Sequence, residues 1–178
     1  YVALLCLQTS KAGGESRIAS SVSLYNKMLA ERPDLVKELC KDFYWSRIGE
    51  IPPGLGPYYL MPVFSFDDGY ICVRGVSTQI YKSQGLEGVP DYTEKQHEAL
   101  DYFKATVESL SFDMEFREGD IQILHNHVML HSRRGFEDWP APEKRRHLLR
   151  LWLRDDLGRS LMPEYQKVIS GVELEGVE

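Results

Sequence analysis

The sequence predicts a mainly β protein, a β-sandwich or barrel with two or three helices on its outside. Residues 1–7 form an apolar run typical of a buried strand. Two more strand-like runs, 58–66 and 70–76, are joined by Asp-Asp-Gly, a strong hairpin signal. Apolar and polar residues alternate from Phe112 to Arg117, as in a strand with one solvated face. Strands this far apart along the chain must pair non-locally, which favours a layered or closed sheet.

Helices are expected between these strands. Leu24 and Met28 belong to an apolar stripe of helical spacing, which predicts a helix over residues 21–31. Pro33 suits the first turn of a second helix, over residues 33–42. The run Thr-Glu-Lys-Gln at 93–96 matches a capping box, and Leu100 and Phe103 follow it at core spacing.

Turn residues and apolar patterning assign the remaining segments. Glycine and proline predict loops over 9–16 and 44–57, and residues 77–92 are expected to be irregular. Strands are expected over residues 1–8, 121–131 and 146–154. The length suits one domain spanning residues 1–178.

Charge and cysteine content exclude several classes of protein. The net charge of −6 argues against a general nucleic-acid-binding protein, which needs a basic face for phosphates. No apolar stretch is long enough to span a membrane. Cys6, Cys40 and Cys72 include no C-x-x-C pair, which favours buried thiols in a reducing, cytoplasmic setting. The sequence carries no signal for the oligomeric state.

Three histidines, His125, His127 and His131, lie within seven residues of one predicted strand. In a regular strand all three would share a face, and His127 and His131 would be roughly 13 Å apart. Ring nitrogens bind a metal at about 2 Å, so those two histidines cannot share one ion. Either His125 and His127 form a metal-binding pair, or His131 is a single ligand with partners elsewhere.

The next predicted strand carries two arginines on one face. Arg146 and Arg150 alternate with Leu149 and Leu151, so the leucine face is predicted to be core. Arginines on a concave face cost much desolvation unless they meet anions, and arginine binds carboxylates through two parallel hydrogen bonds. A histidine ligand followed by an arginine fifteen positions later suggests a metal-chelating dicarboxylate anchored at its far end.

Five blocks of the sequence carry a family resemblance. They are Gly-Gly-Glu-Ser-Arg at 13–17, Phe-Tyr-Trp at 43–45, the run 119–131, Phe-Glu-Asp at 136–138, and Arg-Arg-His-Leu-Leu-Arg-Leu-Trp-Leu at 145–153. Together they resemble the taurine dioxygenase (TauD/TfdA-like) family of Fe(II)/2-oxoglutarate-dependent oxygenases. The resemblance spans about residues 1–155, and its late blocks are fairly specific in order and spacing.

The resemblance implies a double-stranded β-helix, or jelly roll, that holds Fe(II) and 2-oxoglutarate. In that family a His-x-Asp pair and a distant His bind the iron and leave positions open for cosubstrate and oxygen. His131 matches the distant His, and Arg146 matches the arginine that pairs with the far carboxylate of 2-oxoglutarate. Arg150 matches a second arginine of the active site, and Ser16 stands where a hydroxyl also contacts 2-oxoglutarate.

One part of the family pattern is missing from the chain. No His-x-Asp or His-x-Glu occurs in the 178 residues. In the family that pair precedes the strand that begins here at Tyr1, so an N-terminal portion of the jelly roll would precede it too. We therefore expect the metal partners of His131 to lie upstream of Tyr1.

The main interpretation is an oxygenase that hydroxylates or otherwise oxidises a small organic substrate while 2-oxoglutarate is decarboxylated to succinate. Arg150 favours an anionic substrate, or equally a further contact to 2-oxoglutarate. Two alternatives remain: a non-catalytic jelly-roll binding protein without the full iron triad, and a cupin-like metal enzyme that uses His125 and His127.

Overall fold

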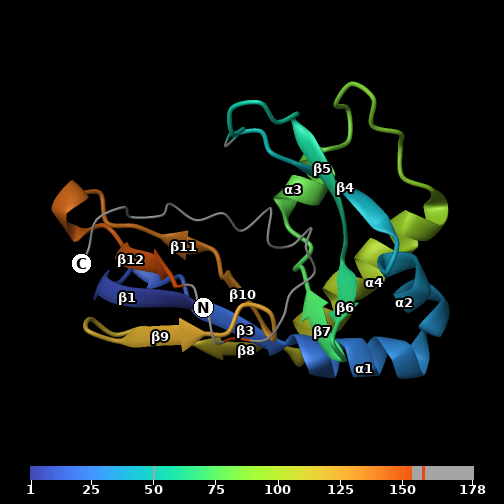
Figure 1. Cartoon of the computed structure of the whole chain (residues 1–178). Helices are drawn as coiled ribbons and strands as arrows, with labels where there is room; N and C mark the ends of the chain where they lie inside the picture. The colour runs from blue at the N-terminus through green and yellow to red at the C-terminus, as the bar shows by residue number, and fades with distance from the viewer. Residues whose placement is uncertain (50, 154–157, 159–178) are drawn as a thin grey trace.

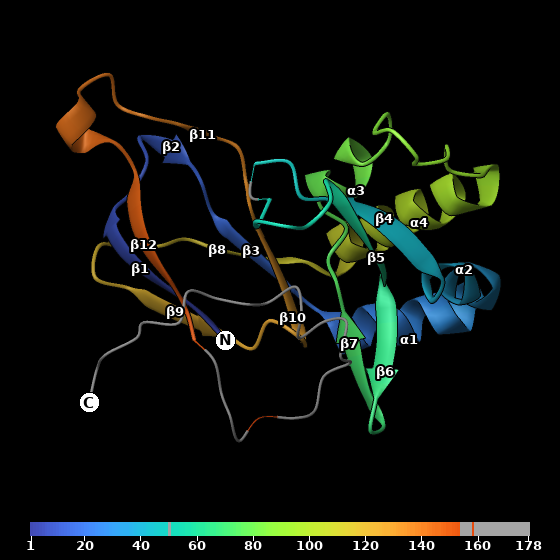
Figure 2. The ribbon, with the colours of Figure 1, turned by 45° about the horizontal axis from the view of Figure 1, so that its top comes forward.

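Two lobes, visible in Figures 1 and 2, make up the computed structural model, which describes residues 1–49, 51–153 and 158. The sheet lobe holds β1–β3 and β8–β12, and the helical lobe holds α1–α4 and β4–β7. Among the described residues, no helix combines the length and apolar character that crossing a bilayer would require. The mainly β fold with flanking helices is confirmed.

The sheet lobe contains two three-stranded antiparallel sheets and a two-stranded ribbon. The first sheet places β1 (Val2–Gln8) between β12 (His147–Trp152) and β9 (Ile121–Leu124). The second places β3 (Ser16–Ser20) between β10 (Met129–Arg133) and β8 (Phe112–Met114). The ribbon pairs β2 (Ala12–Gly13) with β11 (Phe136–Glu137), and the short 3-10 helix η1 (Pro142–Lys144) precedes β12.

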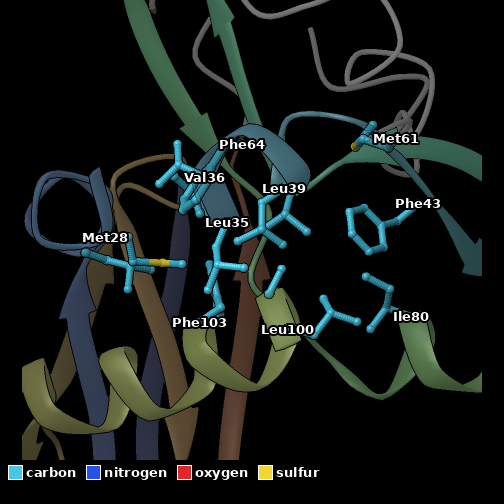
Figure 3. Close-up of a cluster of buried hydrophobic side chains, with 14 of the residues drawn as sticks. Met28, Leu35, Val36, Leu39, Phe43, Met61, Phe64, Ile80, Leu100 and Phe103 are labelled. Atoms are coloured by element: carbon cyan, nitrogen blue, oxygen red, sulfur yellow. The ribbon is translucent and has the colours of Figure 1, made fainter. Parts of the chain in front are cut away.

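The helical lobe holds the large buried cluster. Its helices are α1 (Ser21–Glu31), α2 (Pro33–Leu39), α3 (Thr78–Lys82) and α4 (Glu94–Leu110). Its hairpins pair β4 (Asp42–Ser46) with β5 (Tyr58–Pro62), and β6 (Phe64–Asp67) with β7 (Tyr70–Val73). Met28, Leu35, Leu100 and Phe103 meet between these elements (Figure 3).

Local signals fixed the helix starts as the sequence predicts. The Thr93 hydroxyl accepts from the Gln96 backbone N–H, and the Gln96 side-chain oxygen accepts from the Thr93 backbone N–H, so the capping box is confirmed. Pro33 lies in the first turn of α2. Asp68 and Gly69 take positive φ angles in the β6–β7 turn, as a tight hairpin requires.

Several predicted element boundaries are wrong. Strand β4 extends into the loop predicted over 44–57, and α3 lies in the segment expected to be irregular, 77–92. The single strand predicted over 121–131 is two strands in different sheets, because a turn at 125–128 carries the chain from β9 to β10. The end of the predicted strand 146–154 falls at residue 154, outside the described residues.

The leucine face of β12 is not core, contrary to the sequence-based prediction. Leu149 and Leu151 are 47% and 62% exposed, and His147 on the same face is exposed as well. Along 112–117 the expected alternation holds except at Phe112, which is exposed: Met114 and Phe116 are partly buried, and Asp113, Glu115 and Arg117 are exposed. Alternation distinguishes the two faces of a strand but cannot tell which face the rest of the molecule covers. Cys40 is likewise exposed, whereas Cys6 and Cys72 are buried as expected.

Candidate anion-binding site between the sheets

The expected site residues lie on facing surfaces of the two three-stranded sheets. In the second sheet His131 pairs with Ile18 and Arg133 pairs with Ser16. Directly paired residues of antiparallel strands project to the same side, so His131, Arg133 and Ser16 share a face. Arg150 shares the inner face of the first sheet by the same rule, because it pairs with Leu4 of β1.

A hydrogen bond shows that these faces look toward each other. The Ser16 hydroxyl lies 3.0 Å from Oε1 of Gln122, which also pairs with Leu4 in the first sheet. Ser16 is 3% exposed and Gln122 is 6% exposed, so the bond is buried between the sheets. The Gln122 amide nitrogen also lies 3.9 Å from the sulfur of Met114.

His131 is held in a form suited to bind a metal. The residue is exposed to solvent, yet partial desolvation by neighbouring atoms lowers its pKa, and the charge of Arg150 lowers the pKa further. Both effects favour the neutral imidazole, which is the form that coordinates metals.

Arg146 lies just before β12 and is half-buried. Its backbone N–H donates to the Asp138 carboxylate at 2.8 Å, and its guanidinium lies 3.5 Å from the Gly14 carbonyl oxygen. Burial lowers its pKa, and the nearby charge of Arg133 lowers it further.

The Gly-Gly loop explains how Arg146 fits against the chain. Gly14 has a φ of +84°, a conformation that disfavours other residues. A Cβ at Gly14 would lie 2.8 Å from the Ser10 hydroxyl and 3.3 Å from Nε of Arg146. Glycine therefore allows both the turn and the close approach of the arginine.

Three arginines near the inner faces of the sheets form no side-chain ion pair in the described part of the chain; Arg146 is half-buried, and Arg133 and Arg150 are exposed. Arg133, Arg146 and Arg150 form no ion pair with any described carboxylate, whereas Arg17 pairs with Asp113 and Glu108. Arg145, next to Arg146, is exposed and contacts the Pro140 carbonyl oxygen at 3.5 Å. The region between the sheets therefore offers unused cationic donors to an anion.

A cavity of about 270 Å³ adjoins the Arg146 end of this site. The residues that line it include Arg146, Gly14, Cys6 and Leu148. Ser16, His131 and Arg150 do not line it, so of the four expected residues only Arg146 faces this space. Of the other three, Ser16 bonds to Gln122, and Arg150 is near enough to His131 for its charge to lower the pKa of the imidazole.

No complete metal site lies within the described residues. They contain no group of three or more His, Cys, Asp or Glu side chains placed to hold an ion. His125 and His127 lie in the turn between β9 and β10, with ring centroids 5.6 Å apart. Nδ1 of His127 lies 3.1 Å from the sulfur of Cys72. The described chain supplies no third ligand for a His125/His127 metal site, and it supplies His131 alone to the iron site.

Sequence reasoning missed three residues of this region, Gln122, Arg133 and Phe136. Arg133 is two positions after His131 and thus on the same face of β10, which alternation could have indicated. Gln122 could not be placed, because the predicted strand over 121–131 ran through a turn. Phe136 lies under two guanidinium groups, 4.1 Å from that of Arg133 and 5.5 Å from that of Arg146.

Comparisons with known proteins bear on the family and the fold of the chain. The family described as "Taurine catabolism dioxygenase TauD, TfdA family" matches residues 1–152. The taurine hydroxylase-like protein SAT17 of Stachybotrys chartarum is 34% identical, over 87% of this chain and 40% of that protein. FR-33289 synthase of Streptomyces rubellomurinus is 32% identical, over 88% of this chain and 48% of that protein. The chain thus spans less than half the length of both curated relatives.

Solved structures show the same fold. An asparagine oxygenase in complex with Fe(II), 3-hydroxyasparagine and succinate matches 84% of this chain and 43% of its own, with a TM-score of 0.61 and 22% identity. The non-heme iron oxygenase OrfP in complex with Fe covers 84% of this chain and 44% of its own, with a TM-score of 0.57 and 18% identity. At these identities the likeness establishes the fold alone.

Proposed function

Because the chain belongs to the TauD, TfdA family of taurine catabolism dioxygenases, we propose that it serves an Fe(II)- and 2-oxoglutarate-dependent oxygenation of a small organic substrate. The observation that carries this proposal is Arg146, a half-buried arginine without a described acidic partner. A dicarboxylate held there by one end could extend toward His131 with the other. In this reaction 2-oxoglutarate would be decarboxylated to succinate.

The residues present fit 2-oxoglutarate better than they fit iron. Arg146 would hold the far carboxylate through charge-assisted hydrogen bonds. The Ser16 hydroxyl has one proton, which it donates to Gln122 here, so it would contribute a further bond only by turning that proton to the carboxylate. For iron the described residues offer only His131, so we propose that a His-x-Asp or His-x-Glu pair preceding Tyr1 supplies the other ligands. When bound, the iron and 2-oxoglutarate supply the oxidising power.

The chain's own side chains would orient the reactants. The charge of Arg150 favours the neutral form of the His131 imidazole, and the exposed guanidinium would be available to an anionic group of the substrate. Gln122 holds the Ser16 hydroxyl in a fixed direction between the sheets. The asparagine oxygenase structure contains a hydroxylated amino acid, so small carboxylate-bearing molecules are the first substrates to screen.

The test compares the 178-residue chain with the protein encoded by the complete gene. Each is given Fe(II), 2-oxoglutarate and oxygen, and succinate is measured. We expect the longer protein to form succinate and the 178-residue chain to form none. Equal succinate formation by both would place all the ligands in this chain and favour the His125/His127 pair.

A non-catalytic binding protein is the second candidate, because the described residues hold a cationic site without a complete metal site. It predicts that the gene-length protein binds 2-oxoglutarate without consuming it. Calorimetric binding together with an unchanged 2-oxoglutarate concentration under oxygen would support this candidate.

A further inference from the structure

Phe136 brings two positively charged side chains together at the edge of the site. The guanidinium of Arg133 lies 4.1 Å from the ring centroid, and that of Arg146 lies 5.5 Å from it. An aromatic face stabilises a nearby cation, so the ring can hold both groups in place. The two cations repel each other, and no described carboxylate forms a side-chain ion pair with either, although the Asp138 carboxylate accepts from the Arg146 backbone N–H and offsets part of the charge there.

The register of β10 directs Arg133 inward and its neighbour outward. Arg133 is paired with Ser16 and lies two residues from His131, so all three lie on one face of the second sheet; Ser16 is buried there, and Arg133 and His131 are exposed. Arg134 follows the strand and pairs instead with Asp113 and Glu108, outside the site. The adjacent arginines therefore differ in ion pairing: Arg134 has acidic partners, and Arg133 has none among the described residues.

We propose that Arg133 acts with Arg146 as a two-arginine clamp for the distal carboxylate of 2-oxoglutarate. The proposal rests on the proposed function and assigns it a further binding residue. A carboxylate has two oxygens and about four acceptor positions, so it can accept hydrogen bonds from two guanidinium groups at once. The incoming negative charge would also remove the repulsion between the two arginines across Phe136.

The alternative is that Arg133 only packs on Phe136 and supports the fold locally. The two roles differ in what they recognise. A clamp for the distal carboxylate discriminates 2-oxoglutarate from 2-oxopentanoate, which has the same 2-oxo acid head but no distal carboxylate. A packing role affects both ligands alike.

The experiment measures the affinities of both ligands for the gene-length protein, loaded with Fe(II) and titrated anaerobically by calorimetry. The variants are Arg133→Gln, Arg133→Lys and Arg146→Gln, with Arg145→Gln as the exposed control. We expect Arg133→Gln to reduce the preference for 2-oxoglutarate over 2-oxopentanoate by about tenfold or more, as for loss of a charge-assisted pair. Arg133→Lys should keep part of the preference, and Arg145→Gln all of it.

The possible outcomes distinguish failure of the two-arginine clamp from failure of the proposed function. If Arg133→Gln weakens both ligands equally, or neither, Arg133 is not part of a clamp. If it fails to fold, the preference measured in Arg133→Lys decides, because a packing role predicts a wild-type ratio. If the wild-type protein itself does not prefer 2-oxoglutarate, the proposed function fails before the clamp is in question.

Discussion

At the scale of single residues, Arg145 and Arg146 are neighbours in sequence with different surroundings. Arg146 is half-buried against Gly14 and Phe136, and Arg145 is exposed beside Pro140. We expect Arg146→Ala to weaken 2-oxoglutarate binding by about 2–5 kcal/mol, because a partly buried charge pair is lost. Arg145→Ala should leave the affinity nearly unchanged in the same calorimetric titration. Equal losses from the two substitutions would contradict the assignment of Arg146.

His131 should give the protein a specific dependence of stability on pH. Burial and the charge of Arg150 lower its pKa in the folded state, so below the unfolded value of about 6.5 the unfolded chain binds more protons. The free energy of unfolding should therefore decrease as the pH falls through that region. His131→Gln should show a shallower decrease than the wild-type protein in urea unfolding at about pH 7.5, 6.5 and 5.5, which reach about one unit on either side of the unfolded pKa. Identical slopes would mean that His131 is not desolvated.

At the scale of elements, the capping box of α4 makes a measurable contribution to stability. The Thr93 hydroxyl accepts from the Gln96 backbone N–H, and the Gln96 side-chain oxygen accepts from the Thr93 backbone N–H. Thr93→Ala should lower the free energy of unfolding by about 1 kcal/mol, since an N-cap bond is lost. Thr93→Ser keeps the hydroxyl and should remain close to wild type in the same urea titration. A loss in Thr93→Ser as large as that in Thr93→Ala would assign the effect to the methyl group instead.

The predicted and observed elements differ where distant contacts decide the structure. The capping box and the Asp-Asp-Gly turn were predictable because each depends on a few adjacent residues. The break between β9 and β10 was not, since the turn at 125–128 is fixed partly by Ser21, whose N–H donates to the Val128 carbonyl oxygen. Periodicity contains no information about a partner more than a hundred residues away.

The candidate site likewise contains residues that the sequence could predict and one that it could not. Residue pattern and family resemblance together predicted Ser16, His131, Arg146 and Arg150 as site residues, and the structure places the first two in the second sheet, Arg150 in the first, and Arg146 just before β12. Gln122 depends on where β9 ends, so it could not be assigned to a face beforehand.

At the scale of the whole molecule, the outer face of the β12-β1-β9 sheet is apolar and exposed. Ile123 and Leu151 flank Ala3 across three strands, and each is 62% exposed. Exposed apolar patches bind hydrophobic dyes and promote association. The 178-residue chain carrying Ile123→Thr and Leu151→Thr should bind such a dye more weakly and keep its unfolding free energy within about 1 kcal/mol of wild type.

Val2 provides the matched comparison for this face. It is fully buried on the opposite, inner face of the same sheet, where it pairs with Leu124 and Trp152. Val2→Thr should leave dye binding to the native chain unchanged and lower the unfolding free energy, because a hydroxyl is buried. A large stability loss in the outer-face double variant would show that the face is covered in solution.

The concentration of buried side chains in the helical lobe should make the exchange of backbone amide protons uneven. Leu24, Leu100 and Phe103 belong to one buried cluster, and they lie in α1 and α4. Amides there should exchange with solvent only through large openings, whereas β9 and β12, edge strands of a half-exposed sheet, should exchange through smaller ones. Mass spectrometry of deuterium uptake would resolve the two lobes as regions of slow and fast exchange. Uniform uptake across both lobes would mean that they open together as one cooperative unit.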